Sequence, residues 1–326
     1  MNKTINFFVK KEDHGKRVDI FLTKKINDLT RSHLKKLIEK NNLSINGKLI
    51  LASSTKIKTK DKVCISVRNQ IDKKLVPQKL NLNIIYEDKD ILVIDKPKGM
   101  VVHPGAGNFD NTLANALAFK YKKNLSNLNG DLRPGIVHRL DKKTSGLLVV
   151  AKNNTSHSNL GKQFNKHSIG RKYLCLAWGV IRPLNGRIET LISRNKKNRQ
   201  LMAVSEFKGK KAITNYKTLK VFFSRDIPKI SLVECELETG RTHQIRVHLN
   251  YKGASLLGDE KYGKKKLIFK KINKEFKSYL DQFDGQALHA TTLEFEHPTK
   301  NKRISFSSKI PEDFEKMLNF LTNECG

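Results

Sequence analysis

The sequence has few cysteines, and they are too far apart to form a disulfide framework or a cysteine-based zinc site. Four cysteines are scattered over 326 residues, and no two of them form a Cys-x-x-Cys pair. Disulfide-rich secreted domains and zinc ribbons both depend on closely spaced cysteines, so neither class fits. We therefore expect reduced, mostly packed thiols in a cytoplasmic protein.

Long apolar runs are also missing. The start of the chain contains only a short apolar stretch, from Ile5 to Val9. A secretion signal needs an apolar region of about 7–15 residues followed by a cleavage site of small residues. A membrane helix needs about 18 consecutive apolar residues, and no run approaches that length. The sequence therefore predicts neither a secretion signal nor a membrane span.

Acidic residues are scarce relative to basic ones. The chain has 31 Asp and Glu against 64 Lys and Arg, which gives a formal net charge of +33. A surface this positive attracts polyanions, of which nucleic acid is the commonest, and an anionic membrane surface is the weaker competitor. Lysine is frequent throughout the chain, so part of the excess is equally consistent with solvated surface lysines. Charge therefore favours a nucleic-acid partner without identifying a site.

Several common catalytic motifs are absent. The glycine-rich loop at residues 96–108 carries no Gly-Lys-Ser/Thr that would open a helix, so it is not a phosphate-binding P-loop. Ser145 does not lie in a Gly-x-Ser-x-Gly turn, which argues against a serine hydrolase. His243 and His248 lack the spacing that places two metal ligands on one helical face, and His138 has no cluster of carboxylates beside it. We expect no metal centre.

The first 70 residues have the pattern of a small unit with two helices. Val18, Phe21 and Leu22 share one helical face. A second helix is expected to start at Thr30, which is an effective N-cap. The apolar face of this second helix consists of Leu34, Leu37 and Ile38. Two packed helices with apolar inner faces predict a core for this unit.

The outer positions of the second helix are basic. Arg31, Lys35 and Lys36 are candidate RNA contacts, because a helix with basic outer positions can follow a phosphate backbone. An ordinary solvated helix face explains them equally well. After this helix, Asn46-Gly47 predicts a tight turn, and residues 62–67 alternate like a closing strand.

A larger region follows a polar linker. The linker is expected at residues 71–80 and the larger domain at residues 81–326. The strands expected in this domain lie at residues 84–86, 91–94, 146–151, 173–180, 231–237 and 286–295, and the helices at residues 154–166, 242–251 and 311–321. The lysine-dense segment 261–277 is either an RNA-facing insertion or a charged loop.

Two segments of the larger domain, residues 134–148 and 238–248, concentrate polar and reactive side chains beside apolar strands. In the first segment, Asp141 lies between Leu140 and a buried strand and is flanked by basic residues. A carboxylate close to cations stays ionised, and it can act as a nucleophile, a base or an ion-pair anchor. On spacing alone, a structural role is the commoner one for such an aspartate.

The string HRLDKKTSGLLVVAK at residues 138–152 resembles the signature of the RluA/RluC/RluD family of pseudouridine synthases. Further blocks agree in order: RKYL at residues 171–174, ETGRTHQIRVHL at 238–249, QALHA at 286–290 and His-Pro at 297–298. The strings RVDIFLTK, TRSHLKKLIEKNNLSINGK and DKVCISV resemble an S4 RNA-binding domain. The likeness covers nearly the whole chain and is strongest to the RluD branch of the family. Two positions depart from the pattern of that branch: an acidic residue is usual at position 143, where this chain has Lys143, and an arginine is usual at position 285, where it has Gly285.

The resemblance implies an isomerisation of uridine to pseudouridine. It makes Asp141 the nucleophile, Tyr173 the aromatic ring beneath the flipped base, and Arg246 the arginine that pairs with the aspartate. Arg241 is the competing candidate for that pairing. A planar cation suits the space that a flipped base leaves, and the resemblance gives this role to Arg139.

Ile245 is expected to form part of an apolar wall that excludes water from the intermediate. The implied fold is α+β: a small α/β S4 domain at residues 1–70, then a pseudouridine synthase domain with a mixed, largely antiparallel sheet flanked by helices. The resemblance implies a monomeric protein whose partner is RNA. The expected target is several uridines of one stem-loop in 23S rRNA or in a large-subunit precursor. No cofactor, metal or membrane is expected. Two kinds of alternative stay open. The target could be another rRNA site or a tRNA, and the protein could instead be a non-catalytic assembly factor that binds RNA, or a hydrolase.

Overall fold

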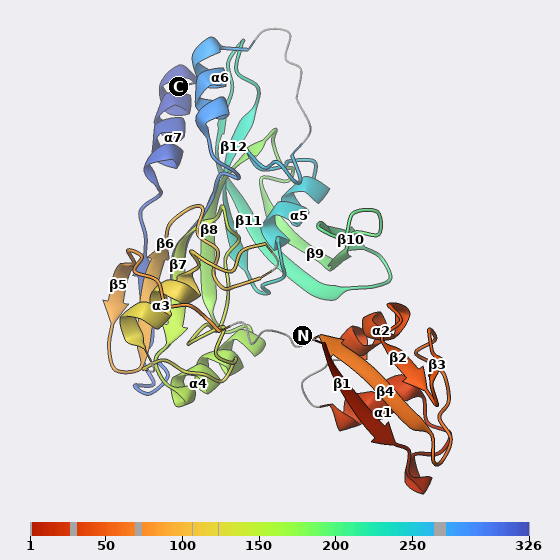
Figure 1. The fold of residues 1–326 in the computed structure, drawn as a ribbon. Coiled ribbons are helices and arrows are strands. Elements are labelled where there is room, and N and C mark those ends of the chain that lie inside the picture. Colours follow the sequence, from red (N-terminus) through yellow and green to blue (C-terminus); the bar gives the residue numbers. More distant parts are fainter. Residues whose placement is uncertain are drawn as a thin grey trace. The chain divides into compact units, whose positions relative to one another are not determined.

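The computed structural model describes residues 2–26, 31–68, 74–105, 107–122, 124–263 and 272–325. Three sequence expectations fall at least partly outside these ranges: the helix cap at Thr30, the start of the linker at residues 71–73, and residues 264–271 of the lysine-dense segment. The chain forms two compact units, residues 1–74 and residues 75–326 (Figure 1).

The smaller unit is a four-stranded antiparallel sheet with two helices, in the strand order β1-β4-β2-β3. The helices are α1 (Val18–Lys25) and α2 (Arg31–Glu39), and the strands are β1 (Asn2–Phe8), β2 (Leu43–Ile45), β3 (Lys48–Leu49) and β4 (Lys62–Arg68). Phe21 and Leu22 of α1 pack with Leu34 and Ile38 of α2 in one core, so the two predicted apolar faces are confirmed. The predicted turn joins β2 to β3.

The outer face of α2 is basic, and two of its three candidate RNA contacts already have acidic partners. Arg31, Lys35 and Lys36 are all exposed. Arg31 Nη2 lies 3.0 Å from Asp19 Oδ2, and Lys35 Nζ lies 3.8 Å from Glu39 Oε1. Lys36 has no ion-pair partner within the described part of the chain, so it is the least committed cation of this face.

The larger unit is built on one ten-stranded sheet with the order β10-β9-β11-β12-β8-β13-β7-β6-β5, in which β14 also pairs with β13. Every pairing in this sheet is antiparallel except the short parallel contact between β13 and β7. The sheet is therefore mixed and largely antiparallel, and the predicted α+β fold is confirmed.

The helices and strands of this unit have the following bounds. The strands are β5 (Asn83–Glu87), β6 (Ile91–Lys96), β7 (Ser145–Ala151), β8 (Gly170–Trp178), β9 (Asn185–Arg194), β10 (Met202–Ser205), β11 (Lys210–Phe222), β12 (Ile230–Leu237), β13 (Leu288–Glu296) and β14 (Arg303–Ser307). The helices are α3 (Leu113–Tyr121), α4 (Asn154–Asn165), α5 (Gln244–Tyr251), α6 (Lys274–Gln282) and α7 (Glu312–Cys325). Within the described ranges, every helix falls short of the length or the apolar character that a membrane-spanning segment requires.

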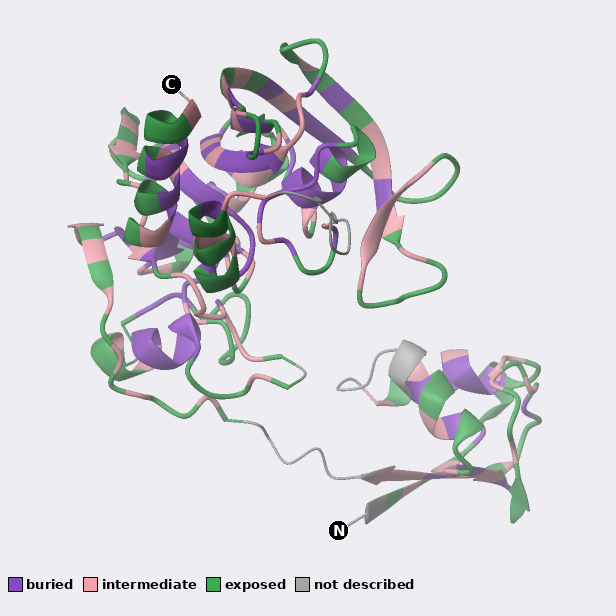
Figure 2. Cartoon of the chain, turned by 90° about the horizontal axis from the view of Figure 1, so that it is seen from above, coloured by how far each residue is buried: buried purple, intermediate pink, exposed green. Residues whose placement is uncertain are grey.

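Both faces of the central strands are covered, and buried residues concentrate there (Figure 2). On one face, Leu117 of α3 and Leu249 of α5 share a core with Leu148 of β7. On the other face, Leu160 of α4 packs with Leu147, the neighbouring residue of β7. Successive side chains of a strand point to opposite faces, so β7, which is buried along its whole length, contributes leucines and valines to both cores.

Residues 75–80, part of the stretch interpreted as a linker, pack on the larger unit. Leu75 packs against its main core. The backbone amide of Gln78 donates to the carbonyl of Asn115 at 3.0 Å. The side chain of Asn115 donates in return to the carbonyl of Val76 at 2.8 Å. The division between the units accordingly lies between residues 74 and 75.

Candidate active site

The larger unit contains a cavity of about 380 Å³. Both polar segments identified in the sequence contribute to its wall, with residues 137–141 and 144 from the first and residues 240–246 from the second. A third stretch, between residues 164 and 173, completes the lining. Reactive side chains that lie far apart in the sequence therefore meet around one space, and Asp141, Tyr173 and Arg246 are all among them.

Asp141 forms an ion pair with Arg246 on this wall. Arg246 Nη1 lies 2.8 Å from Asp141 Oδ2. The Nε and Nη2 atoms of the same guanidinium bind the two oxygens of Asp259 at 2.7 and 2.8 Å. The side chain of Asp141 keeps 17% of its surface exposed, whereas that of Asp259 keeps none. Arg246 thus joins one carboxylate that faces the cavity to another that is fully buried.

The charge of Arg246 is secured by these two carboxylates. Burial by itself would lower the pKa of Arg246, because it penalises the charged form. Asp259 and Asp141 act in the opposite direction and raise this pKa above its ordinary value. A bidentate pair also fixes the plane of the guanidinium. Asp141 is therefore oriented by a partner that is permanently charged and does not rotate.

The start of α5 positions Arg246. His243, the N-cap residue of α5, has a left-handed backbone with φ of 57°. The side chain of Gln244 accepts hydrogen bonds from Thr239 Oγ1 at 2.8 Å and from the backbone amide of Arg241 at 2.9 Å. These bonds close a tight turn in front of the helix. The first turn of α5 then delivers Ile245 and Arg246 to the cavity.

Lys96, for which the sequence predicts no role, supports the turn that carries Asp141. Its fully buried ammonium donates to the carbonyl oxygens of Pro97 at 2.8 Å, Met100 at 2.9 Å and Lys142 at 3.3 Å. Burial lowers the pKa of Lys96 to about 7, and the charge of Asp141 acts in the opposite direction. Its partners are backbone groups of separate loops, so no sequence motif marks them.

The two departures from the family pattern, Lys143 and Gly285, touch each other beside the Asp141 turn. Lys143 Nζ forms an ion pair with Asp284. Gly285 has a left-handed backbone with φ of 79°, and a Cβ atom there would lie 2.6 Å from the Cβ of Lys143. Glycine at position 285 therefore avoids a close contact with the side chain at position 143, and Lys143 pairs with Asp284, the residue before this glycine.

Tyr173 and Ile245 supply the apolar surface of the cavity. They are 7% and 3% exposed and belong to one core cluster. Burial raises the pKa of Tyr173, the guanidinium of Arg171 lowers it, and the charge of Asp141 raises it. The phenol is therefore neutral at physiological pH. A flat ring beside an aliphatic side chain suits the face of a planar heterocycle.

Arg139 and Arg241 contribute two cations to the cavity, and neither forms an ion pair within the described residues. Arg139 is exposed, with Nη1 3.4 Å from His103 Nε2. Arg241 Nε donates to the carbonyl of Lys211 at 2.8 Å. Of the two candidates to pair with Asp141, Arg246 makes the contact and Arg241 does not.

The histidines of the two polar segments have separate environments. His138 Nε2 accepts a hydrogen bond from the amide of Val149 at 3.0 Å, and burial lowers the pKa of His138 to about 3. His243 Nδ1 lies 2.7 Å from the hydroxyl of Tyr262, and its Nε2 lies 3.8 Å from Asp141 Oδ1. His248 is fully buried. Each ring therefore has polar partners of its own.

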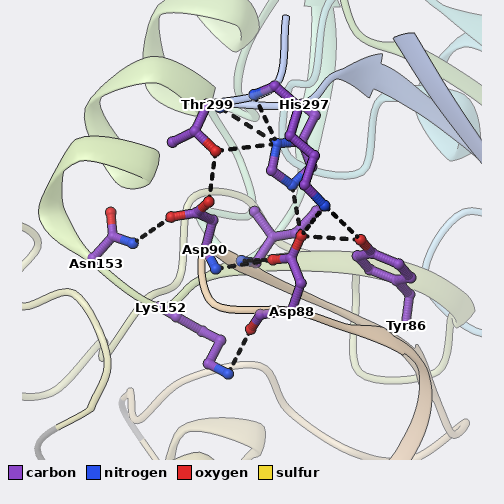
Figure 3. Close-up of polar contacts among 9 residues, drawn as sticks. Tyr86, Asp88, Asp90, Lys152, Asn153, His297 and Thr299 are labelled. Carbon is purple, nitrogen blue, oxygen red and sulfur yellow. Dashed lines mark hydrogen bonds and ion pairs between the residues drawn. The ribbon is translucent and has the colours of Figure 1, made fainter. Parts of the chain in front are cut away.

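One group among the described residues has the side chains and spacing of a metal site, and it does not line the cavity. The possible ligand atoms of Asp88, Asp90 and His297 lie within 4.8 Å of one another (Figure 3). Asp88 Oδ2 contacts His297 Nε2 at 2.8 Å and the ammonium of Lys300 at 2.9 Å, and Thr299 donates to Asp90. The lysine supplies the positive charge at this point. The contacts of this group connect the β5–β6 turn to the β13–β14 turn.

Comparisons with known proteins all lead to one family. A family model described as RNA pseudouridylate synthase matches residues 90–251, a range that includes Asp141, Tyr173 and Arg246. The chain is 40% identical to the RNA pseudouridine synthase YlyB of Bacillus subtilis, over 97% of this chain and 98% of that protein. It is 42% identical to the ribosomal large subunit pseudouridine synthase D of Zymomonas mobilis, over 94% of each.

The fold also matches a solved structure. The human RNA pseudouridylate synthase domain containing 4 aligns with a TM-score of 0.56 and 24% sequence identity. The alignment covers 74% of this chain and 93% of that chain. At this level of identity, the likeness concerns the arrangement of helices and strands.

Proposed function

The chain belongs to the RNA pseudouridylate synthase family, and from that premise we propose that Asp141 is the nucleophile with which it converts uridines of 23S rRNA to pseudouridine. One observation carries the proposal: the carboxylate of Asp141 faces a cavity that also presents Tyr173, and it is oriented by Arg246 at 2.8 Å. A nucleophile needs a fixed direction and room for the reacting atom, and this arrangement supplies both.

The reaction breaks the bond between C1′ of the ribose and N1 of uracil and forms a bond between C1′ and C5. The hydrogen lost from C5 is matched by one gained at N1, so no oxidant and no transferred group is involved. In one route Asp141 adds to C1′ while uracil departs, and in the other it removes a proton from C2′. Both routes need an ionised carboxylate beside the sugar.

The target base has to leave the RNA stack before Asp141 can reach its sugar, which costs about a few kcal/mol. We assign Arg139 to the space that the base leaves. Its side chain is exposed at the cavity and makes no ion pair with any described residue. A guanidinium is planar and stacks on neighbouring bases, which offsets part of the cost of flipping.

Tyr173 and Ile245 are assigned to the flipped base itself. A neutral phenol can stack on uracil, and its hydroxyl can assist removal of the C5 proton at the end of the reaction. The apolar surface also limits the access of water, which would otherwise capture the intermediate and leave an abasic site.

The proposed target is a stem-loop of 23S rRNA with several modified uridines. It is supported by the names of relatives such as the ribosomal large subunit pseudouridine synthase D of Vibrio cholerae, which is 39% identical over 97% of this chain. The smaller unit is assigned to RNA binding as an S4 domain, through the basic face of α2. A net charge of +33 is consistent with phosphate contacts at both units.

Replacement of Asp141 by Asn tests the mechanism. The variant keeps the shape of the side chain and the pair between Arg246 and Asp259 but removes the nucleophile. We expect tritium release from C5-labelled uridine RNA to fall by at least about 1,000-fold, which is the order of loss when a nucleophile is removed. Asp281→Asn, which changes an exposed aspartate of α6, is the matched control and should retain activity. Persistent release by Asp141→Asn would disprove the proposed role.

The target is tested separately by mapping pseudouridine across total RNA in cells with and without the protein. We expect a small group of sites in one stem-loop of 23S rRNA to disappear when the protein is absent. Loss of sites only in tRNA or elsewhere in rRNA would refute the target and leave the result for Asp141 unaffected.

A further inference from the structure

A second arginine is buried in the cavity wall, and the reaction described above does not use it. Arg171 of β8 is 6% exposed and lies two residues before Tyr173. Residues two apart in a strand point to the same face, about 7 Å from each other. The guanidinium of Arg171 and the ring of Tyr173 therefore lie next to each other along one wall of the cavity. A single nucleotide is large enough to reach both.

The polar partners of Arg171 are neutral. Its Nη2 donates to the carbonyl oxygens of Leu237 at 3.2 Å and Glu238 at 3.1 Å. Its Nε is buried and has no hydrogen-bond partner. No carboxylate forms an ion pair with this guanidinium in the described part of the chain. An isolated buried charge is costly unless an opposite charge is near, so the protein alone leaves this site poorly compensated.

The surroundings of Arg171 increase this imbalance. Burial lowers the pKa of Arg171, and Arg241 acts in the same direction, while Tyr173 has the opposite effect. The ring of Phe164 lies 5.5 Å from the central carbon of the guanidinium and makes a cation–π contact, which offsets part of this cost but supplies no negative charge. Arg241 is thus a second cation acting on Arg171, while Asp141, the one acidic residue that lines the cavity, is paired with Arg246.

The backbone leaves space beside the guanidinium. A Cβ atom at Gly240 would lie 2.7 Å from Nη1 of Arg171, so only glycine at this position avoids the contact. Nη1 makes no hydrogen bond with the described residues. The edge of the guanidinium beside Gly240 is thus kept free of both side chains and protein acceptors.

We propose that Arg171 binds a phosphodiester group of the substrate RNA next to the target uridine, with Arg241 as a second cation of this phosphate site. A phosphate matches the planar fork of a guanidinium and supplies the missing negative charge. Arg246 is unavailable for this task because its nitrogens already bind Asp141 and Asp259. The inference depends on the proposed function only in that the target nucleotide enters this cavity.

The competing explanation is structural: Arg171 would do no more than bind the carbonyl groups at the end of β12. A double-mutant cycle between protein and RNA separates the two. The RNA is a stem-loop with one mapped target uridine, made with a neutral methylphosphonate at either the 5′ or the 3′ linkage of that uridine. The protein is the full chain or its Arg171→Gln variant, and kcat/KM is measured for every combination.

With the unsubstituted protein, we expect one of the two methylphosphonates to lower kcat/KM by about tenfold to a hundredfold, the worth of a hydrogen bond between charged groups. Arg171→Gln should lower kcat/KM for ordinary RNA by a similar factor, and the methylphosphonate should then cause no further loss. Additive losses at both linkages, or no effect of either methylphosphonate on the unsubstituted protein, would overturn the phosphate site.

Two controls keep the result interpretable. Arg303→Gln removes one positive charge from an exposed arginine that pairs with Glu294, and it should lower activity equally for both kinds of RNA. If Arg171→Gln does not fold, Arg171→Lys replaces it in the cycle, because lysine keeps the positive charge. The methylphosphonate that lowers kcat/KM for the unsubstituted protein should then cause a smaller loss with Arg171→Lys. The same cycle can be repeated in the Asp141→Asn background with RNA affinity as the measured quantity, which does not depend on turnover. Failure of the proposed nucleophile and failure of the phosphate site therefore give different results.

Discussion

Two arginines are buried on the same cavity, and their surroundings are opposite. Arg246 lies between two carboxylates, those of Asp141 and Asp259. Arg171 is buried to a similar degree but contacts only carbonyl oxygens among the described residues. The fold thus supplies the counter-charges of one arginine and leaves those of the other to a ligand.

The difference separates two tasks of an active site. A cation whose partners are part of the fold is fixed before the substrate arrives, and it can orient a reacting group without further reorganisation. A buried cation without an acidic partner gains most when an anion binds, so it contributes to affinity. We therefore expect substitutions around Arg246 to act on kcat and on stability, and substitutions around Arg171 to act mainly on KM.

The largest effect should come from replacing each arginine by lysine. The single ammonium in Arg246→Lys cannot contact Asp141 and both oxygens of Asp259, so kcat should fall by about 100- to 1,000-fold. The free energy of unfolding should also fall by about 3 kcal/mol, because Asp259 stays buried with a poorer partner. Arg171→Lys should instead raise KM by about tenfold.

Steady-state kinetics with one RNA and thermal unfolding of each variant check this contrast. Arg303→Lys on the surface is the control for the change of side chain, and both of its kinetic constants should stay near those of the unsubstituted protein. If both buried arginines changed the same kinetic constant, the division of tasks between them would be wrong.

Acid should lower the stability of the protein through His248, which lies on the same helix as Arg246. The fully buried ring bonds Thr190 at 3.0 Å and Thr214 at 2.9 Å, and burial lowers the pKa of His248 to about 4. The unfolded chain takes up this proton near pH 6.5, before the folded protein does. Stability from the neutral ring is therefore complete above about pH 6.5 and is lost as the pH falls towards 4, by up to about 3 kcal/mol.

Melting temperatures between pH 4 and pH 7 test this expectation, since His248→Gln should show a flatter dependence than the unsubstituted protein. The slope should not vanish, because the pKa of His138 is also lowered by burial. His167→Asn, at an exposed position, is the matched control. Equal slopes for His248→Gln and the unsubstituted protein would show that the ring of His248 does not titrate as described.

Gly240→Ala should disturb the Arg171 end alone. The added methyl group would press on Nη1 of Arg171 at 2.7 Å and move the guanidinium. We expect KM to rise by about fivefold to tenfold with little change in kcat, since one charged hydrogen bond is weakened. Gly161→Ala in α4 is the control, because a Cβ there meets no atom within 4 Å. An unchanged KM for Gly240→Ala would argue against a phosphate at this point.

The residues proposed as catalytic could be picked out from the sequence because they lie in short strings. Asp141, Tyr173 and Arg246 each belong to a block that resembles a family signature, and the structure brings them to one cavity. Asp259 and Lys96 were not found, because their roles come from tertiary contacts with a distant side chain and with loop carbonyls. In a chain with so many lysines, nothing in the local sequence distinguishes a buried one.

Arg171 illustrates the same limit more sharply. It lies in the RKYL string, but no role was predicted for it. A signal was available, since a charged residue two positions before an inward-facing tyrosine shares its face of the strand. The long strands β9 and β11 were also missed. Charged and polar residues interrupt both strands, so no long apolar run marks them.

The smallest effect should come from the ion pair between Lys143 and Asp284, next to the Asp141 turn. The two side chains are 35% and 60% exposed, so their attraction is weakened by solvent. Lys143→Glu should place two carboxylates together and lower the free energy of unfolding by about 0.5–1 kcal/mol. Adding Asp284→Lys should restore most of this loss, because it reverses the pair and leaves Gly285 unchanged.

Chemical unfolding of both variants at low and high salt measures the difference, which salt should reduce. If the double variant were no more stable than Lys143→Glu, the attraction between positions 143 and 284 would contribute nothing measurable to stability.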